Sequence, residues 1–313
     1  MLSRTADSLF WSSRYLERAD FQARILETGL RLASLPSING PRNEWESAVA
    51  ASGDMACFHA HYDVISEETA RDFILFNRDN PSSIRNCFAV ARANARAVRT
   101  AITSEMWEAI NETWLELKTI SDRDMGREET LRFLEWVKRA PRAVEGAMHR
   151  SMLRNDAYWF TRIGAAIERA DNTARILDVK YHLLLPANER IGGSLDYFQW
   201  TAILRQVSAL TAYHWVYRES VRPWLVADLL ILNRQMPRSL AACYADLAQN
   251  LDLIADAYGQ HGPGQQQAGN TLARLESLRI GDIFQSGLHE FITDFIKDNN
   301  RLGNTLANQY LLS

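Results

Sequence analysis

The ten-residue stretch Glu17-Arg18-Ala19-Asp20-Phe21-Gln22-Ala23-Arg24-Ile25-Leu26 occurs a second time, as Glu168-Arg169-Ala170-Asp171-Asn172-Thr173-Ala174-Arg175-Ile176-Leu177. Eight of the ten positions are identical, at a separation of 151 residues in a chain of 313. Identity this dense at one fixed offset predicts two copies of a single helical unit laid end to end.

Each copy has the spacing of an amphipathic helix, with apolar residues every three or four positions. The predicted stripe consists of Leu9, Leu16, Ala19, Ala23, Leu26 and Leu30 in the first copy and of Phe160, Ile167, Ala170, Ala174, Leu177 and Tyr181 in the second. The alanines in successive turns would let another helix approach closely. We therefore interpret the stripe as a buried seam.

Charged residues of the motif lie beside this seam. They are Glu17, Arg18, Asp20 and Arg24 in the first copy and Glu168, Arg169, Asp171 and Arg175 in the second. On each helix the Glu, the Asp and the second Arg fall close together, and the first Arg is expected to project from the other flank. One interpretation is ordinary i,i+4 pairs, worth ~0.3 to 0.5 kcal/mol each on an exposed face. The other is an acid-base cluster where helices from both copies meet, paired because a lone buried charge costs several kcal/mol.

A second repeated segment extends the duplication. Residues 72–87 match residues 228–243 at an offset of 156, with six of sixteen positions identical. Both copies predict a helix, an Asn-Arg turn, and a proline just before the next long helix. Strand-type alternation is essentially absent, so we predict an all-α fold in which two pseudo-repeated bundles, residues 1–150 and 151–313, pack into one body.

Helices are expected over residues 5–32, 83–117, 127–152 and 155–184, with Pro141 kinking or breaking the third of these. Two aromatic-rich regions, residues 45–62 and 197–224, are interpreted as core-lining helices. The glycine- and glutamine-rich stretch 259–267 is expected to be a disordered loop before a last pair of helices.

Composition bounds the functions open to the chain. A formal net charge of −3 and a pI near 6.2 give no global attraction to nucleic acid or acidic membranes, so such binding would need a local patch. Three cysteines at long separations, Cys57, Cys87 and Cys243, do not form a disulfide framework or a thiolate zinc site of usual spacing. With no leader-type N-terminus and no membrane-spanning run, we expect a cytoplasmic protein.

Four arginines distinguish the first half. Arg85, Arg92, Arg96 and Arg99 would line up on one face of a continuous helix, whereas the matching positions of the second half are Ala241, Ala248, Asp252 and Ala255. The stripe is either a binding face for a carboxylate, a phosphate or an acidic partner, or a solvated face paired with acids from elsewhere in the fold.

A further charged cluster follows an aromatic run. Arg218 and Arg222 are four residues apart with Glu219 between them, a spacing that on a helix permits a grip on a carboxylate. The same residues could instead pin one helix to another.

Metal and cofactor signatures are missing from the sequence. No Glu-x-x-His spacing of a bundle di-metal centre occurs, and Glu145 with His149 is a lone pair. No phosphate-binding glycine loop or serine nucleophile elbow occurs either. We therefore expect no metal and no cofactor.

With its two Glu-Arg-Ala-Asp copies, the segment Asn80-Pro81-Ser82-Ser83-Ile84-Arg85 and the segment Tyr217-Arg218-Glu219-Ser220-Val221-Arg222-Pro223-Trp224, the chain resembles the bacterial alpha-E family. This is a helical domain named for its Glu-Arg motif, and the resemblance covers nearly the whole chain. It implies a protein encoded beside, or fused to, a circularly permuted ATP-grasp protein, often near a transglutaminase-like peptidase. One departure is Ala165-Ala166, where Arg14-Tyr15 stand in the first copy, so a role of Arg14 does not carry over to both copies.

Three functions follow as hypotheses. The first is a helical partner or accessory subunit of an ATP-grasp amide or peptide ligase, which binds the ligase or its anionic substrate through the Glu-Arg seam and the arginine stripe. The second is an enzyme of peptide modification that uses Glu17 or Glu168 for proton transfer in a cleft between the copies. The third is an RNA-binding helical module that uses the arginine stripe, which the acidic pI disfavours.

Overall fold

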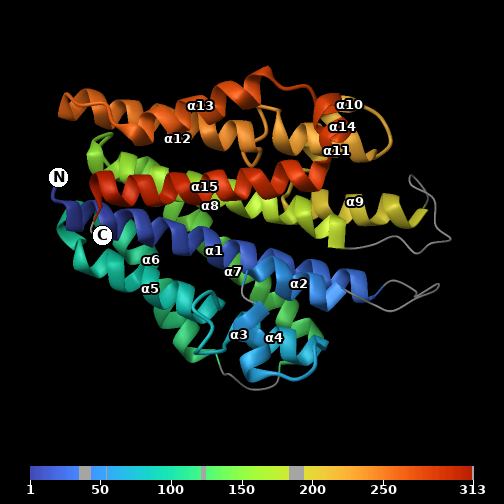
Figure 1. Ribbon diagram of the computed structural model, residues 1–313. Coiled ribbons are helices and arrows are strands. Elements are labelled where there is room, and N and C mark those ends of the chain that lie inside the picture. Colours follow the sequence, from blue (N-terminus) through green and yellow to red (C-terminus); the bar gives the residue numbers. More distant parts are fainter. Residues whose placement is uncertain (35–43, 54, 121–124, 183–193, 312–313) are drawn as a thin grey trace.

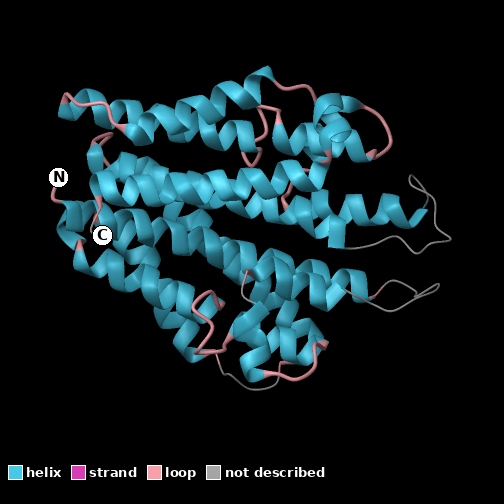
Figure 2. Ribbon diagram, in the orientation of Figure 1, coloured by secondary structure: helices cyan, strands magenta, loops and turns pink. Residues whose placement is uncertain are grey.

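The computed structural model describes residues 1–34, 44–53, 55–120, 125–182 and 194–311, with the side chains of residues 179–182, 194 and 195 left out of the description. These residues form helices and connecting loops, and no strand lies among them (Figure 2). The helices are α1 Ser3–Ala33, α2 Glu44–Ser52, α3 Met55–His61, α4 Glu67–Leu75, α5 Ile84–Ala97, η1 Arg99–Ala101, α6 Ser104–Thr119, α7 Arg127–Ser151, α8 Asp156–His182, α9 Ser194–Gln206, α10 Leu210–Tyr217, α11 Pro223–Ile231, α12 Leu240–Tyr258, α13 Pro263–Ser277, α14 Ile280–Ser286 and α15 Leu288–Tyr310. The prediction of an all-α fold is confirmed.

The two helices that carry the repeated motif, α1 and α8, pack along each other through the middle of the molecule (Figure 1). They run in the same direction. The amino group of Met1, just before α1, lies 3.1 Å from Asp156 at the start of α8, and two helical turns or more further along both helices Arg18 of α1 bonds Glu168 of α8. The two copies of the motif therefore lie at the same level along the pair of helices.

Matching sets of helices surround this central pair. Helix α1 also packs against α5 and α7, which are linked by α6, while α8 packs against α12 and α15, which are linked by α13 (Figure 1). The body thus consists of the same packing pattern on both sides of α1 and α8.

Small side chains allow the central helices to come close. Ala19, Ala23, Ala170 and Ala174 are fully buried, as the predicted seam requires. At Gly164, a Cβ atom would lie 2.3 Å from the carbonyl oxygen of Phe10, so only glycine fits this contact between α8 and α1. Close packing of the two backbones fixes the register in which the charged residues meet.

Two helix predictions were wrong in detail. The predicted helix 83–117 is interrupted, because Val98 leaves the helical conformation and Thr103 caps the new helix α6 by accepting a hydrogen bond from the Met106 amide at 3.4 Å. Pro141, which was expected to kink or break its helix, lies within α7 and does not break it. The predicted disordered loop 259–267 is mostly helical, since Pro263 begins α13 and the Gly262 amide donates to Gln265 Oε1 at 3.1 Å.

Other features agree with the sequence. Helices α1 and α8 begin and end within two residues of their predicted bounds. The matching cysteines Cys87 and Cys243 are buried, and burial raises the pKa of each thiol to about 12. Within the described ranges, no helix combines the length and the apolar composition that a bilayer crossing requires.

Candidate functional site

The two Glu-Arg pairs bind each other crosswise between α1 and α8. Arg18 of α1 donates from Nε to Glu168 Oε1 at 2.6 Å and from Nη2 to Glu168 Oε2 at 3.1 Å. Arg169 of α8 donates from Nε to Glu17 Oε1 at 3.0 Å, and its Nη2 contacts the same oxygen. The arginines do leave their own helices on the flank opposite the acids, and the parallel register then places each one on the glutamate of the other copy. The clusters therefore form two neighbouring junctions inside the molecule.

We name them by their glutamates. The Glu168 junction consists of Arg14, Arg18, Glu168, Asp171 and Arg175. The Glu17 junction consists of Glu17, Asp20, Arg24, Arg169 and Arg238.

Glu168 is fully engaged. Both of its oxygens accept charge-assisted hydrogen bonds, because Arg14 Nε donates to Oε2 at 2.7 Å in addition to the bonds from Arg18. Burial alone would raise the pKa of Glu168, but the charges and hydrogen bonds of Arg14 and Arg18 outweigh it and lower the pKa to about 2. At neutral pH this carboxylate is ionised and holds no proton to donate.

In the Glu17 junction, a third arginine arrives from the turn before α12. Arg238 Nη2 donates to Asp20 Oδ2 at 2.8 Å, and Arg238 Nη1 lies 3.6 Å from Glu17 Oε2. Burial would raise the pKa of Asp20, and the neighbouring Arg238 and Arg24 hold it below its ordinary value instead. Burial would likewise lower the pKa of Arg169, yet its attraction to Glu17 raises it well above the ordinary value.

The last arginine of this junction, Arg24, has three hydrogen-bond partners. Arg24 donates from Nε to Asp20 Oδ2 at 2.6 Å, and from Nη1 to the Gln206 carbonyl at 2.6 Å and to Ser208 Oγ at 3.0 Å. Ser208 follows α9 in the left-handed region, with φ of 57°. These contacts close the Glu17 junction against the end of α9.

The Glu168 junction is open where the Glu17 junction is closed. Arg175 donates to Asp171 Oδ2 at 2.6 Å, but the position that matches Arg238 in the repeated segment is Ser82. A pocket of about 200 Å³ lies there. It is lined by Arg18, Phe21, Gln22, Ser52, Gly53, Ser82, Glu168, Asp171, Asn172 and Arg175.

A comparison with known protein families assigns residues 1–311 of the chain to one family. The family model Alpha-E, described as a predicted alpha-helical domain with a conserved ER motif, matches residues 1–311. The chain belongs to the Alpha-E family. Neither the curated proteins nor the solved structures contain a significant match to it.

In this Alpha-E protein, the sequence predicted the motif residues but missed Arg14 and Arg238, which complete the junctions. It also missed Glu145, which lies 3.5 Å from Arg169 at the border of the Glu17 junction. A signal existed for the first two, because Arg14 stands opposite Ala165 and Arg238 opposite Ser82 when the copies are aligned. An arginine that occurs in just one of the two copies indicates a position at which the junctions differ.

The predicted stripe Arg85, Arg92, Arg96 and Arg99 does not form one helical face, because α5 ends at Ala97 and Arg99 belongs to the short helix η1. Arg92 donates to Asn111 Oδ1 at 2.9 Å and lies over the Trp107 ring, as Arg99 also does. Arg85 has a partner as well, while Arg96 is exposed. The stripe therefore divides into Arg92 and Arg99, which contact α6, a half-buried Arg85, and an exposed Arg96.

The cluster of Arg218, Glu219 and Arg222 was predicted with helical geometry, which is wrong. Arg218 has a left-handed conformation with φ of 53° at the end of α10, and Arg222 precedes α11, so the three residues lie on the loop between these helices. Arg222 Nε lies 3.5 Å from Glu219 Oε2, with both side chains about half exposed.

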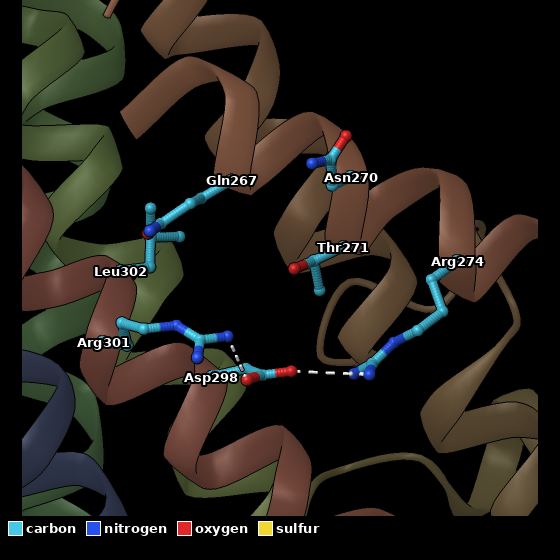
Figure 3. Close-up of a pocket in the computed structure, with 7 residues that line it drawn as sticks. All are labelled: Gln267, Asn270, Thr271, Arg274, Asp298, Arg301 and Leu302. Atoms are coloured by element: carbon cyan, nitrogen blue, oxygen red, sulfur yellow. Dashed lines mark hydrogen bonds and ion pairs between the residues drawn. The ribbon is translucent and has the colours of Figure 1, made fainter. Parts of the chain in front are cut away.

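A second hollow, of about 190 Å³, lies between α13 and α15 (Figure 3). Asp298 there accepts a hydrogen bond from Arg301 at 2.6 Å and lies 3.4 Å from Arg274 on the opposite helix. None of the Glu-Arg motif residues lines it. Across the described residues, no group of three or more side chains is arranged to hold a metal ion.

Proposed function

We propose that this Alpha-E protein is a cytoplasmic helical accessory subunit of an ATP-dependent amide or peptide ligase system, and that it docks on a circularly permuted ATP-grasp protein. A transglutaminase-like peptidase would act in the same pathway. Support for the partner comes from the family resemblance, and support for a docking role comes from the surface of the molecule.

One observation carries the docking role. Helices α9, α10 and α11 pack against one another at one end of the molecule and expose large aromatic side chains (Figure 1). The exposed fractions are 76% for Trp215, 51% for Phe198, 44% for Trp224 and 41% for Tyr197. Arg222 lies over the Trp224 ring on the adjoining loop. Trp, Tyr and Arg are the residues most enriched among the energetically dominant contacts of protein interfaces, so we assign docking to this aromatic end, defined as Tyr197, Phe198, Trp215, Trp224 and Arg222.

We also infer that residues 1–150 and 151–313 derive from one duplicated bundle. The repeated motif, the matching packing partners of α1 and α8, and the crosswise Glu-Arg pairs support this origin. A positive φ recurs as well, at Gly53 after α2 and at Ser208 after α9, each beside the second arginine of a motif.

The enzymatic hypothesis gains less support. A pocket does adjoin Glu168, as that hypothesis requires, but an ionised glutamate held by two arginines is a poor proton donor and a weak base. RNA binding by the arginine stripe is also disfavoured, because Arg92 and Arg99 are already engaged with α6.

Co-purification tests the docking role. The full chain is co-expressed with the circularly permuted ATP-grasp protein. Size-exclusion chromatography then shows whether a complex forms, and surface plasmon resonance measures its affinity. We expect a stable complex that Trp215→Ala with Trp224→Ala weakens by about 30-fold or more.

The matched control is Arg96→Ala, which removes an exposed side chain from the far α5 region and should leave the affinity unchanged. Separate elution of the two wild-type proteins, with ATP turnover of the ligase unaffected, would remove the proposed partner. Loss of binding in the arginine variant alone would move the docking surface to the stripe.

A further inference from the structure

The pocket of the Glu168 junction has a counterpart that shows what can occupy it. At the Glu17 junction, the guanidinium of Arg238 fills the space beside Asp20 and Glu17. At the Glu168 junction, Ser82 takes the place of Arg238, and the space beside Asp171 and Glu168 is a pocket. At this position the Glu17 junction therefore has a guanidinium of the chain, and the Glu168 junction has a pocket.

Two buried acceptors line this pocket without a hydrogen-bond partner among the described residues. They are Asp171 Oδ1 and Gln22 Oε1, and the Gln22 residue is fully buried. The orientation of the Gln22 amide is fixed, because its Nε2 donates to the Ser52 carbonyl at 3.3 Å. A buried acceptor left unpaired costs about 1 to 3 kcal/mol. Asp20 Oδ1 and Glu17 Oε2 of the closed junction are unpaired as well, but here a pocket gives a ligand with N–H donors access to the acid pair.

The arginines of the junction can bind an anionic group of the same ligand. Three arginines, Arg14, Arg18 and Arg175, pair with only two carboxylates, Glu168 and Asp171. Arg175 uses its Nε for Asp171, and its side chain is 29% exposed at the pocket, so guanidinium donors remain for an anion. A simple cation would increase the excess of positive charge, whereas a zwitterion leaves it unchanged.

We propose that this pocket binds a small free amino acid. Its ammonium group would donate to Asp171 Oδ1 and Gln22 Oε1, and its carboxylate would lie against the guanidiniums of Arg175 and Arg18. A volume of about 200 Å³ is below the roughly 300 to 1,000 Å³ of pockets for drug-sized ligands, which favours a compact side chain and excludes a nucleotide. This site is independent of the proposed ligase partner, since it needs only the contacts of the isolated chain.

Isothermal titration calorimetry on the full chain tests the proposal, with glycine, L-alanine and L-serine as probes. We expect one saturable site per chain. N-acetyl-L-alanine, which lacks the ammonium, and L-alaninamide, which lacks the carboxylate, should each bind about 10- to 100-fold more weakly than L-alanine, because each loses a charge-assisted set of hydrogen bonds.

A variant that closes the pocket from within provides the structural test. Ser82→Arg reproduces the arrangement of Arg238 and should abolish binding while the thermal melt stays cooperative. Ala93→Arg adds the same charge at an exposed position of α5 and should bind as wild type does. Ser82→Leu is a second, uncharged block in case the arginine variant does not fold.

Several outcomes would overturn the proposal. They are an absence of heat with every amino acid, equal affinity for L-alanine and for either of its one-group analogues, and wild-type affinity in a folded Ser82 variant. None of these outcomes bears on docking to the ATP-grasp protein, which is measured separately.

Discussion

The Glu17 and Glu168 junctions are built from the same motif and differ in one arginine each. Both have a glutamate held by an arginine of the other copy and an aspartate held by an arginine one turn further along its own helix. The Glu17 junction takes its third arginine from position 238, in the turn before α12, and is closed. The Glu168 junction takes its third arginine from position 14, on α1, and stays open beside Asp171.

The motif itself therefore provides structure, and the residues around it determine whether a pocket is present. Two central helices in close contact require each buried glutamate to be paired, and the crosswise arrangement satisfies both with one motif. The third arginine is then free to differ between the copies. Where it comes from the side of the junction, as Arg238 does, its guanidinium lies beside the aspartate.

The largest effect expected is in the Glu17 junction, when Arg169 is replaced by alanine. Among the described residues only Arg169 donates hydrogen bonds to the Glu17 carboxylate, and Arg238 is 3.6 Å away. Arg169→Ala should therefore lower the free energy of unfolding by about 3 to 5 kcal/mol, as for other buried ion pairs that lose one partner. Arg18→Ala should cost less, because Arg14 still holds Glu168. Urea unfolding followed by circular dichroism measures both.

The control for this pair is Arg31→Ala, which removes an exposed i,i+4 partner of Glu27 and should change the free energy of unfolding by no more than about 0.5 kcal/mol. Equal losses for Arg169→Ala and Arg18→Ala would mean that Arg14 does not compensate, and the distinction between the junctions would fail.

An intermediate loss of stability is expected at acidic pH, because the Glu168 carboxylate becomes protonated there. Folding lowers the pKa of Glu168 from 4.5 to about 2, so the folded state binds this proton less readily than the unfolded state does. The resulting stabilisation, about 3 kcal/mol, is present above pH 4.5 and is lost as the pH falls toward 2. The free energy of unfolding of the wild type should therefore drop across this range.

Glu168→Gln isolates that contribution. Its free energy of unfolding at neutral pH should be lower than that of the wild type, and the gap should narrow between pH 4.5 and 2 because the variant has no proton to take up at this position. Other carboxylates with lowered pKa values, such as Asp20 and Glu145, contribute equally to both proteins. A gap that stays constant with pH would show that Glu168 is not the group that titrates.

The fold could be predicted largely from the sequence because the repeated motif indicates how two helices pack as well as where they form. The offset of 151 residues between the copies indicated twin helices, and the alanines at positions 19, 23, 170 and 174 indicated their close approach. What local spacing could not give was the direction of α8 relative to α1. The parallel register, with Arg18 on Glu168 and Arg169 on Glu17, depends on tertiary packing that no helical wheel contains.

The candidate site was harder to predict for the same reason. Arg238 and Ser82 are far from the motif in sequence, and their importance depends on the turns before α12 and α5 reaching the junctions. The arginine stripe shows the opposite error, in which a regular spacing suggested a face that the break at Val98 removes. Periodicity holds only while the helix continues, and the capping residue Thr103 was the local signal that it does not.

The smallest effect expected compares the second arginines of the two motifs. Arg24 has three partners and a side chain that is 7% exposed, whereas Arg175 has Asp171 as its one hydrogen-bond partner among the described residues and is 29% exposed beside the pocket. Arg24→Gln should lower the free energy of unfolding by about 2 kcal/mol, since a buried carboxylate and a carbonyl lose their donor. Arg175→Gln should lower it by about 1 kcal/mol or less, since the arginine of that pair is partly exposed to solvent. Parallel urea titrations of both variants measure this difference of about 1 kcal/mol in the free energy of unfolding.

The same titrations with saturating L-alanine compare the junctions further. The amino acid should stabilise the wild type and Arg24→Gln but should stabilise Arg175→Gln much less, because only Arg175→Gln has lost a guanidinium of the open junction. The same stabilisation in all three proteins would place the ligand elsewhere and leave the two junctions equivalent.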